Sequence, residues 1–259
     1  MSNLAWFGAL PWLLLLALAA WAVCTLRHNA GLVDIFWPLF LLAAALHALC
    51  LAWPAGTRAM LVLALVAAWA LRLAWHLARR NWNAPEDHRY RAIRLRNEPG
   101  FASKSLYLVF GLQAVLAFLV SAPLFAAITA AATPLHLADF IGAMVVIGGL
   151  AVEAVADAQL AAFRAQRSGR GEVMNRGLWR YSRHPNYFGE FCIWWGFFII
   201  ALGTGGWWSL VSPLLMSLLL WRVSGVRLLE KDIGERRPGY AAYAARTNAF
   251  FPGPPRSLR

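Results

Sequence analysis

The side chains best suited to chemistry lie in one segment, Gly-Leu-Trp-Arg-Tyr-Ser-Arg-His-Pro-Asn-Tyr-Phe-Gly-Glu-Phe-Cys-Ile-Trp-Trp-Gly, which runs from Gly177 to Gly196. Five hydrogen-bonding residues stand at the start of its apolar part: Arg183, His184, Asn186, Tyr187 and Glu190. Charged groups are costly to place in a membrane, so this cluster indicates either a binding site or a basic anchor at the membrane surface. We favour the binding site.

Pro185 predicts where the helix of this segment begins, because proline disfavours helical geometry at the preceding residue and suits the first helical turn. Asn186 and Glu190 are then four residues apart and share one face of the helix. Backbone N–H groups at the helix start, together with Arg180 and Arg183, would attract an anion such as a phosphate.

Further polar residues precede and follow this segment. Glu153, Asp157 and Arg164 fall on one face of a predicted helix and form either an ion pair between helices or part of the same site. Near the C-terminus, Tyr240 and Tyr243 are three residues apart, a spacing that favours packing against a ligand over a plain surface helix.

Asp34 is the first candidate for catalysis, since it lies about one turn into an apolar run, before Pro38, which would kink that helix. Either it lines a substrate cavity, where its protonated form could donate a hydrogen bond, or it pairs with Arg27 or Arg72. The two readings stay open at this point.

His76 is the second candidate. Together with Arg72 and Arg79 it forms a polar stripe on an otherwise apolar predicted helix. A histidine in such a place is more often a packing residue than a catalytic one, and Arg79 suits a side chain that reaches toward the membrane surface.

The composition predicts an all-α integral membrane protein, because 60% of the 259 residues are hydrophobic. A membrane span needs about 20 apolar residues. This criterion gives seven predicted spans: Leu4–Leu26, Leu32–Trp53, Arg58–Ala78, Ser105–Ala131, Leu137–Phe163, Asn186–Leu202 and Trp207–Leu228. We expect a single polytopic domain with substrate-side helices in 1–131 and a cofactor-binding half in 132–259, and a kink near Pro123.

The net charge of +12 comes from basic residues in short loops, which argues against a nucleic-acid-binding domain. With seven spans, nearly all of the 24 basic residues fall on one side and Arg58 alone on the other. The positive-inside rule then predicts an N-out and C-in protein whose site faces the cytoplasm, in a bacterial inner membrane. In the loop Arg80–Ser103 we expect a short amphipathic helix at the membrane surface.

The sequence indicates no metal site or disulfide, because Cys24, Cys50 and Cys192 all lie in apolar runs without paired spacing. A Gly-x-Gly-x-x-Gly turn is also missing, so a dinucleotide site would not be of the Rossmann kind. The first apolar run is long enough to span and lacks a basic start, so we expect a first helix instead of a cleaved signal.

The pattern Gly177-x-x-x-x-x-Arg-His-Pro-Asn-Tyr-x-Gly-Glu resembles the NADPH-dependent membrane reductases, namely the sterol C14-reductases and, more loosely, the steroid 5-alpha-reductases and their bacterial relatives. The shorter core Arg-His-Pro-x-Tyr-x-Gly also resembles the isoprenylcysteine carboxyl methyltransferases, which bind S-adenosylmethionine. The resemblance covers about 153–252. It implies a cofactor site made of Asp157, Arg164, Tyr181, Arg183, His184, Asn186, Tyr187, Glu190, Arg227 and Tyr243.

The expected function is therefore an NADPH-dependent reductase of an activated carbon–carbon double bond in a lipophilic, steroid- or terpenoid-like substrate, similar to the 3-oxo-5-alpha-steroid 4-dehydrogenases. The alternative is an S-adenosylmethionine-dependent methyltransferase, although these commonly carry Glu-Glu where this chain has Glu230-Lys231. Asn186 and Glu190 favour the reductase. The expected partners are the lipophilic substrate and membrane lipids.

The N-terminal half departs from the steroid 5-alpha-reductases. Those enzymes carry a Gln-Glu pair before a proline in the second helix and a tyrosine in the third, whereas this chain has Val33-Asp34-Ile35-Phe36-Trp37-Pro38 and no tyrosine in its third predicted span. The identity of the substrate therefore does not transfer from the resemblance.

Overall fold

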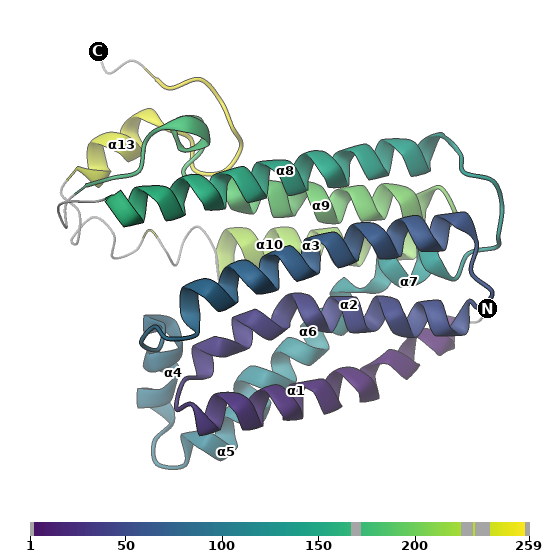
Figure 1. Cartoon of the computed structure of the whole chain (residues 1–259), viewed down its shortest axis with the longest axis horizontal. Helices are drawn as coiled ribbons and strands as arrows, with labels where there is room; N and C mark the ends of the chain where they lie inside the picture. The colour runs from purple at the N-terminus through teal and green to yellow at the C-terminus, as the bar shows by residue number, and fades with distance from the viewer. Residues whose placement is uncertain (1–2, 167–171, 224–229, 231–238, 257–259) are drawn as a thin grey trace. The chain divides into compact units, whose positions relative to one another are not determined.

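The computed structural model describes residues 3–166, 172–223, 230 and 239–256 (Figure 1). Within these ranges the regular structure is entirely helical, without strands. The chain divides into two compact units, one made of 1–139 and 200–212 and the other of 140–199 and 213–259. The all-α prediction is thereby confirmed for the described part of the chain.

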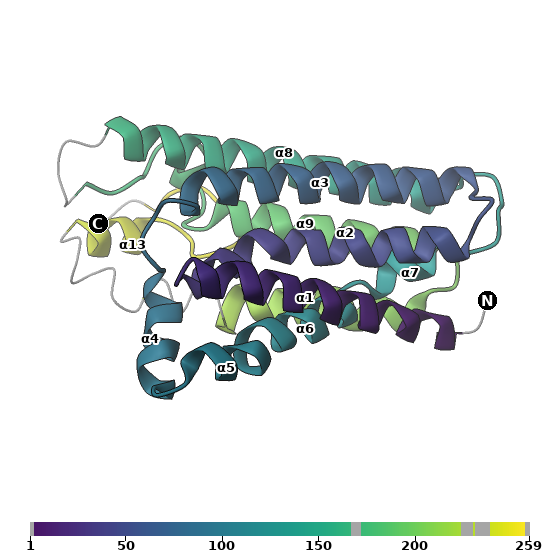
Figure 2. The ribbon, with the colours of Figure 1, turned by 60° about the horizontal axis from the view of Figure 1, so that its bottom comes forward.

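The first unit is built on three long helices, α1 (Ala9–Leu26), α2 (Val33–Leu51) and α3 (Thr57–Asn81), with α2 in contact with both of the others (Figure 2). α6 (Leu112–Val120) packs on α1 and α2. The shorter elements of this unit are η1 (Asn3–Gly8), η2 (Ala30–Leu32), α4 (His88–Asn97), α5 (Phe101–Ser105), the π-helical η3 (Leu106–Gly111), α7 (Ala122–Ile128) and η5 (Trp207–Leu210).

Small residues allow these helices to approach one another closely. Ala44, Ala45 and Ala48 of α2 are all buried, and Phe40 and Trp69 fill the space between the helices. In a membrane, where lipid tails are as apolar as leucine, such small-residue contacts are a main source of helix association.

The second unit contains most of α8 (Leu137–Gln166), then η4 (Gly177–Arg180), α9 (Pro185–Leu202), α10 (Val211–Leu218), the π-helical η6 (Leu219–Val223) and α13 (Tyr240–Arg246). α8 and α9 lie side by side in both ribbon views (Figures 1 and 2). Their backbones touch at glycines, because a Cβ added to Gly189 would lie 2.6 Å from the Gly149 carbonyl oxygen, and one added to Gly149 would lie 2.6 Å from that of Gly189.

The protein is an integral membrane protein. In the described part of the chain, five helices are long and apolar enough to cross a membrane: Ala5–Leu26, Ala30–Leu51, Thr57–Asn81, Phe101–Val120 and Leu137–Gln166. They match five of the seven predicted spans. α9 starts at Pro185, as the proline predicts, but it carries Asn186 and Glu190 in its first half and is not one of the five. The seven-span count and the orientation stay predictions.

One expectation about local structure is confirmed and one needs correction. The kink expected near Pro123 is present as a break in the predicted span Ser105–Ala131, since α6 ends at Val120 and α7 begins after a turn at Ser121, two residues before Pro123. The helix expected after Arg80 exists as α4, but it is not amphipathic. Tyr90 is its one buried residue, and Leu95 is 70% exposed among charged neighbours.

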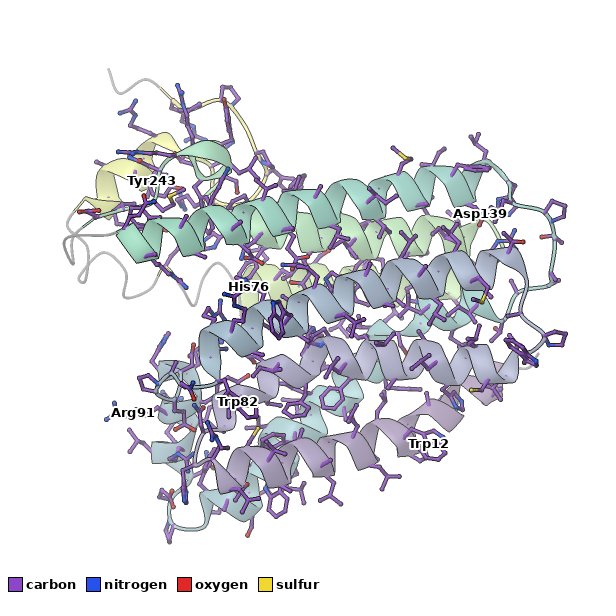
Figure 3. All side chains as sticks on the ribbon, viewed as in Figure 1. Trp12, His76, Trp82, Arg91, Asp139 and Tyr243 are labelled. Atoms are coloured by element: carbon purple, nitrogen blue, oxygen red, sulfur yellow. The ribbon has the colours of Figure 1, made fainter. Side chains whose placement is uncertain are left out.

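A buried ion pair joins the start of α3 to the start of α8 in the first unit. Arg58 donates to Asp139 from Nε at 2.8 Å and from Nη2 at 3.0 Å. The same guanidinium reaches Thr133 Oγ1 and the Pro134 carbonyl oxygen, and Asp139 also accepts from the His136 backbone N–H (Figure 3). Arg58, the one basic residue predicted on the outer side, therefore has protein acceptors for its guanidinium group.

Candidate functional site

Glu230 is the centre of a polar cluster in the second unit. Its Oε1 accepts hydrogen bonds from Arg183 Nε at 2.7 Å, from Tyr240 Oη at 2.9 Å and from His184 Nε2 at 3.0 Å. Its Oε2 accepts from Arg183 Nη2 at 2.8 Å, which completes a two-bond pairing of guanidinium and carboxylate. The carboxylate also selects the histidine tautomer with the proton on Nε2.

The remaining nitrogen of Arg183 is also occupied. Nη1 donates to the carbonyl oxygens of Ala244 at 3.0 Å and Thr247 at 2.7 Å, on the C-terminal side of α13. Burial alone would raise the pKa of Glu230, but hydrogen bonds from His184 and Arg183 lower it to about 2. Arg183 is thus a link between the segment before α9 and the C-terminal part of the chain.

The C-terminal segment is tied to the residues before α9 by main-chain contacts as well. Arg183 N–H donates to the Asn248 carbonyl, Ser182 Oγ to the Phe250 carbonyl, and Gly253 N–H to the Tyr181 carbonyl. Tyr243, on α13, donates its hydroxyl proton to the Trp179 carbonyl (Figure 3). The residues before α9 and the C-terminal segment, some 60 residues apart in the sequence, are therefore packed against each other.

The turn η4 is held against α8 by two hydrogen bonds. Trp179 Nε1 donates to the Ala156 carbonyl at 3.0 Å, and Gln159 Oε1 accepts from the Leu178 backbone N–H at 3.0 Å. Gly177 has φ +57°, in the left-handed region, and a Cβ there would meet the Gln159 amide at 2.5 Å. Because of this positive φ, any residue other than glycine would be strained at this position.

A cavity of about 680 Å³ opens beside η4 and α13, within the range of about 300–1,000 Å³ that is typical of ligand pockets. Its lining residues come from both segments: Val173, Asn175, Arg176, Gly177, Arg180, Gly239, Ala242, Tyr243, Arg246, Thr247 and Pro255. We call it the arginine groove. Arg176, Arg180 and Arg246 are exposed, and their guanidinium groups make no hydrogen bond or ion pair in the described part of the chain. The described lining residues include no carboxylate.

Two pairs of the residues predicted for the cofactor site are in contact. Asn186 Nδ2, in the first turn of α9, donates to Asp157 Oδ1 of α8 at 3.2 Å. The rings of His184 and Tyr187 stack with centroids 5.7 Å apart. The Asn–Asp contact shows that the two polar faces predicted on separate helices lie against each other.

The other predicted cofactor residues are placed as follows. Glu190 is half-buried on α9, Arg164 is exposed near the end of α8, and Tyr181 is 44% exposed, with its carbonyl engaged by the C-terminal segment. Arg227 lies outside the described residues. The assignment of these four side chains to a cofactor stays a prediction.

Asp34 belongs to a second polar cluster, in the first unit. Its Oδ2 accepts from Arg89 Nη2 at 3.0 Å, and its Oδ1 accepts from the Tyr90 hydroxyl. Tyr90 Oη in turn accepts from Gln113 Nε2 of α6 at 3.1 Å. The pairing expectation was right in kind but wrong in partner, because Arg89 of α4 takes the place expected for Arg27 or Arg72.

The position of α4 explains this difference. Asp87 caps the helix by accepting from the Arg89 N–H, and Glu86 accepts from the Ala30 N–H at 2.8 Å and from Arg94 at 2.7 Å. Burial raises the pKa of Glu86, but the bonds from Arg94 and Ala30 lower it below its ordinary value. α4 is thus fastened over the start of α2, and Arg27 instead donates to the Trp82 carbonyl at 3.1 Å.

The sequence did not predict that Glu230 and Tyr240 join Arg183 in one cluster. Nor did it predict that Arg89 and Tyr90 join Asp34 in the other. His76, the other catalytic candidate, is half-buried on α3 (Figure 3). Among the described residues no group of three His, Cys, Asp or Glu side chains is placed to hold a metal ion.

These features define a helical membrane protein with a polar cluster and an arginine-lined cavity formed by the segments before α9 and around α13. The chain belongs to the family described as "Protein of unknown function (DUF1295)", which matches residues 20–247 and is related to the steroid reductases. It is 26% identical over 272 residues to "Uncharacterized protein C594.04c" of Schizosaccharomyces pombe, an alignment that covers 90% of this chain and 75% of the fungal protein. No solved structure matches it.

Proposed function

We propose that the protein is a membrane reductase that uses a nicotinamide dinucleotide to reduce an activated carbon–carbon double bond in a lipophilic, steroid- or terpenoid-like substrate. The relation of its family to the steroid reductases and the Arg183-His-Pro-Asn-Tyr segment support this class. The observation that carries the proposal is the arginine groove, since its positive charge favours one of the two cofactors that the segment allows.

The two cofactors differ in charge. A nicotinamide dinucleotide carries a diphosphate and, in NADPH, a further phosphate, whereas S-adenosylmethionine has no phosphate and bears a cationic sulfonium. The guanidinium groups of Arg176, Arg180 and Arg246 have no hydrogen-bond or ion-pair partner among the described residues, and no carboxylate stands among the described lining residues of the groove. Such a groove attracts a polyanion and disfavours a cation.

Residues of α9 carry groups suited to the other parts of a dinucleotide. When bound, the nicotinamide supplies the hydride. Asn186 and Glu190 offer an amide and a carboxylate for the carboxamide or a ribose, and Tyr187 offers an aromatic surface. Glu230 holds Arg183 and His184 in place, so its role is to position the residues before α9.

We propose Asp34 and His76 as the candidate catalytic residues; both lie in the first unit, and this part of the proposal concerns that unit by itself. Asp34 accepts two hydrogen bonds, so the transferable proton of this cluster lies on Tyr90 Oη. Burial, and after it the nearby Asp34 carboxylate, hold the pKa of Tyr90 well above its ordinary value. To serve the reaction, the one hydroxyl proton of Tyr90 would have to turn from Asp34 Oδ1 to a substrate oxygen. His76 remains the second candidate acid.

The proposal includes the predicted membrane arrangement: seven spans, N-out and C-in, in a bacterial inner membrane with the site facing the cytoplasm. The concentration of basic residues in the loop after α3, in the segment before α9 and at the C-terminus supports it. Labelling of single cysteines introduced between Asn81 and Lys104 in intact cells is the test. Reaction with a reagent that does not cross the membrane would contradict this orientation.

Cofactor binding to the detergent-purified protein tests the function itself. We expect saturable binding of NADPH and none of S-adenosylmethionine. Asn186→Ala and Glu190→Ala should each weaken NADPH binding by about 1–3 kcal/mol, because each removes a hydrogen bond to a polar group. Binding of S-adenosylmethionine that both substitutions weaken, without dinucleotide binding, would establish the methyltransferase instead.

A further inference from the structure

Between two candidate membrane spans, Thr57–Asn81 and Phe101–Val120, the chain forms α4 at one surface of the membrane. In both ribbon views α4 runs across the ends of α1, α2 and α3, where these apolar helices begin or stop (Figures 1 and 2). A helix in this place lies at the level of the lipid headgroups. We propose that the exposed face of α4 binds the headgroups of anionic phospholipids and that this binding holds α4 on the first unit, whichever reaction the protein performs.

The inner side of α4 occupies the carboxylates that lie nearest to it. Arg89 pairs with Asp34 at 3.0 Å and with Asp87 at 3.0 Å. Arg94 pairs with Glu86 at 2.7 Å. Each of these three carboxylates therefore already has an arginine partner on the inner side, and the arginines on the other side of the helix do not share it.

The opposite face of α4 is exposed and positively charged. Its residues follow the i, i+3, i+4, i+7 and i+8 spacing of one helix face, and all of them are exposed: His88, Arg91, Ala92, Leu95 and Arg96. Arg91 points away from the other helices of the unit (Figure 3). The guanidinium groups of Arg91 and Arg96 make no hydrogen bond or ion pair among the described residues, and α4 itself contains no Asp or Glu. Both groups are therefore available to an anion from outside the protein.

Two further arginines at the end of α3 add to this charge. Arg79 and Arg80 are exposed, and Arg80 Nε donates to the neighbouring Asn81 Oδ1 at 2.9 Å. Glu98, which follows α4, is exposed and makes no ion pair among the described residues. The exposed arginines of α3 and α4 thus outnumber the unpaired carboxylates between the two spans, and the surface is positive.

Exposed apolar side chains at the same end of the unit favour a lipid over a dissolved anion. Leu95 lies between the arginines of α4 and is 70% exposed. Leu26, at the end of α1, and Trp75 and Trp82, near the end of α3, are exposed as well. Tryptophan is typical of the interface between membrane and water. A phospholipid offers both a phosphate for the arginines and hydrocarbon for these apolar side chains.

Charge decides which phospholipid fits. Guanidinium groups bind phosphate oxygens through paired N–H groups. Phosphatidylcholine carries a quaternary ammonium group that offsets its phosphate, whereas phosphatidylglycerol keeps a net negative charge. Clusters of basic residues next to a membrane span are attracted to anionic lipids in this way.

Binding on the exposed face acts on the Asp34 cluster, because the same helix carries both. Arg89 and Tyr90 contact Asp34 from the inner side of α4. A ligand that binds only the folded arrangement stabilises it. Anionic headgroups on Arg91 and Arg96 therefore keep α4 over the start of α2 and keep its inner side chains on Asp34.

The experiment titrates the delipidated, detergent-purified protein with phosphatidylglycerol, phosphatidylcholine and sn-glycerol 3-phosphate. Native mass spectrometry measures binding, and the unfolding temperature measures stabilisation. We expect phosphatidylglycerol to bind about tenfold or more tightly than phosphatidylcholine, and glycerol 3-phosphate to leave the unfolding temperature unchanged. Arg91→Gln and Arg96→Gln should each weaken phosphatidylglycerol about 3- to 5-fold, and together about 10- to 25-fold, as expected for basic residues near an anionic surface.

Arg256→Gln is the matched control, since Arg256 is an exposed arginine of the second unit, where it donates to Asn248 Oδ1. It should leave the affinity for phosphatidylglycerol unchanged. Replacing both Arg91 and Arg96 by lysine keeps the charge, so we expect a loss smaller than that of the two glutamine substitutions. Without lipid, the glutamine variants of Arg91 and Arg96 should unfold at the wild-type temperature, because neither guanidinium group has a partner among the described residues.

Amide hydrogen exchange within α4 tests whether the lipid holds the helix in place. Phosphatidylglycerol should slow this exchange in the wild-type protein and not in the double glutamine variant. Equal affinity for the two phospholipids, or an unchanged affinity in the double variant, overturns the proposed lipid site. Binding of glycerol 3-phosphate as tight as that of phosphatidylglycerol would show a site for free phosphate instead. Exchange that the lipid leaves unchanged overturns the link to α4.

Discussion

Two sets of arginines in this molecule differ in what satisfies them. Arg58 and Arg183 are buried or nearly so, and the chain itself supplies a carboxylate and further oxygen acceptors for each. Arg176, Arg180 and Arg246 are exposed, and the described residues supply no acceptor for their guanidinium groups. Arg180 and Arg183 are only three residues apart, so the local sequence does not separate the two sets.

The difference teaches that burial, more than residue type, sets the role of a charge. A guanidinium removed from water needs a partner, because breaking a buried ion pair costs far more than an exposed pair contributes. An exposed guanidinium is satisfied by water until a ligand replaces that water. Substitutions that break the pairs of the buried arginines should thus lower the stability of the protein. Substitutions of the exposed arginines should affect ligand binding.

Asp139→Asn should have the largest effect on stability. The side chains of Arg58 and Asp139 are 4% and 0% exposed, so removing the carboxylate charge leaves a buried cation without its counter-charge. We expect a loss of about 3–5 kcal/mol, measured by chemical denaturation in detergent. Asp87→Asn is the control, because asparagine still caps α4 and the carboxylate is 37% exposed, and a change below about 1 kcal/mol is expected there. Comparable losses of stability in the two variants would contradict the view that burial decides how much a carboxylate contributes.

Glu230→Gln should come next, with a loss of about 2–3 kcal/mol at neutral pH, because Arg183 and Glu230 are 13% and 22% exposed. The folded-state pKa of Glu230, about 2, lies below its ordinary value of 4.5. Its contribution is therefore present above pH 4.5 and is lost as the pH falls toward 2.

Unfolding temperatures measured at several pH values between 5 and 2 test this dependence. The wild-type protein should lose more stability over that interval than the Glu230→Gln variant, since the variant has no carboxyl group to protonate at this position. Parallel curves for the two proteins would show that another group is responsible.

Asp34→Asn should cost less stability, about 1–2 kcal/mol, because the amide keeps one hydrogen-bond acceptor and the Arg89 and Asp34 side chains are 20% and 22% exposed. If Asp34 orients Tyr90 as the proton donor, turnover should fall while NADPH affinity stays the same. Tyr90→Phe should give the same loss of turnover. If Asp34 is only structural, adding Arg89→Gln to Asp34→Asn should restore both stability and turnover.

Arg246→Gln should have the smallest effect on stability, within about 0.5 kcal/mol, because the guanidinium is exposed and has no partner in the described residues. Its unfolding midpoint should match that of Arg91→Gln. A loss of stability as large as that of Glu230→Gln would show that Arg246 is structural, like Arg58 and Arg183. The contrast between buried and exposed arginines would then not hold.

The sequence predicted the features that depend on local rules. Five spans follow from the length of the apolar runs, and the start of α9 follows from Pro185. The contact between Asp157 and Asn186 joins two helix faces that the sequence marked as polar. The clusters around Asp34 and Glu230 could not be predicted from the sequence, because their arginines and tyrosines come from distant segments.

Arg89 and Tyr90 illustrate the reason for this limit. They lie in a charged stretch with no apolar periodicity, so nothing in that stretch indicates which side chain turns toward Asp34. The choice depends on how Glu86 and Asp87 fasten α4, which is a property of the folded protein. The sequence suggests that Arg180 and Arg183 bind the same anion. In the folded protein Glu230 pairs with Arg183 and leaves the guanidinium group of Arg180 exposed.

The glycine contacts between α8 and α9 have a mechanical consequence. A Cβ at Gly196 would lie 2.7 Å from Val146 Cγ2, and those at Gly149 and Gly189 would lie 2.6 Å from the facing carbonyl oxygen, so backbone meets backbone along the seam. Helices in such contact cannot slide past each other without a collision. Any motion that accompanies ligand binding in this unit must therefore move α8, with η4 bonded to it, and α9 together as a single rigid body.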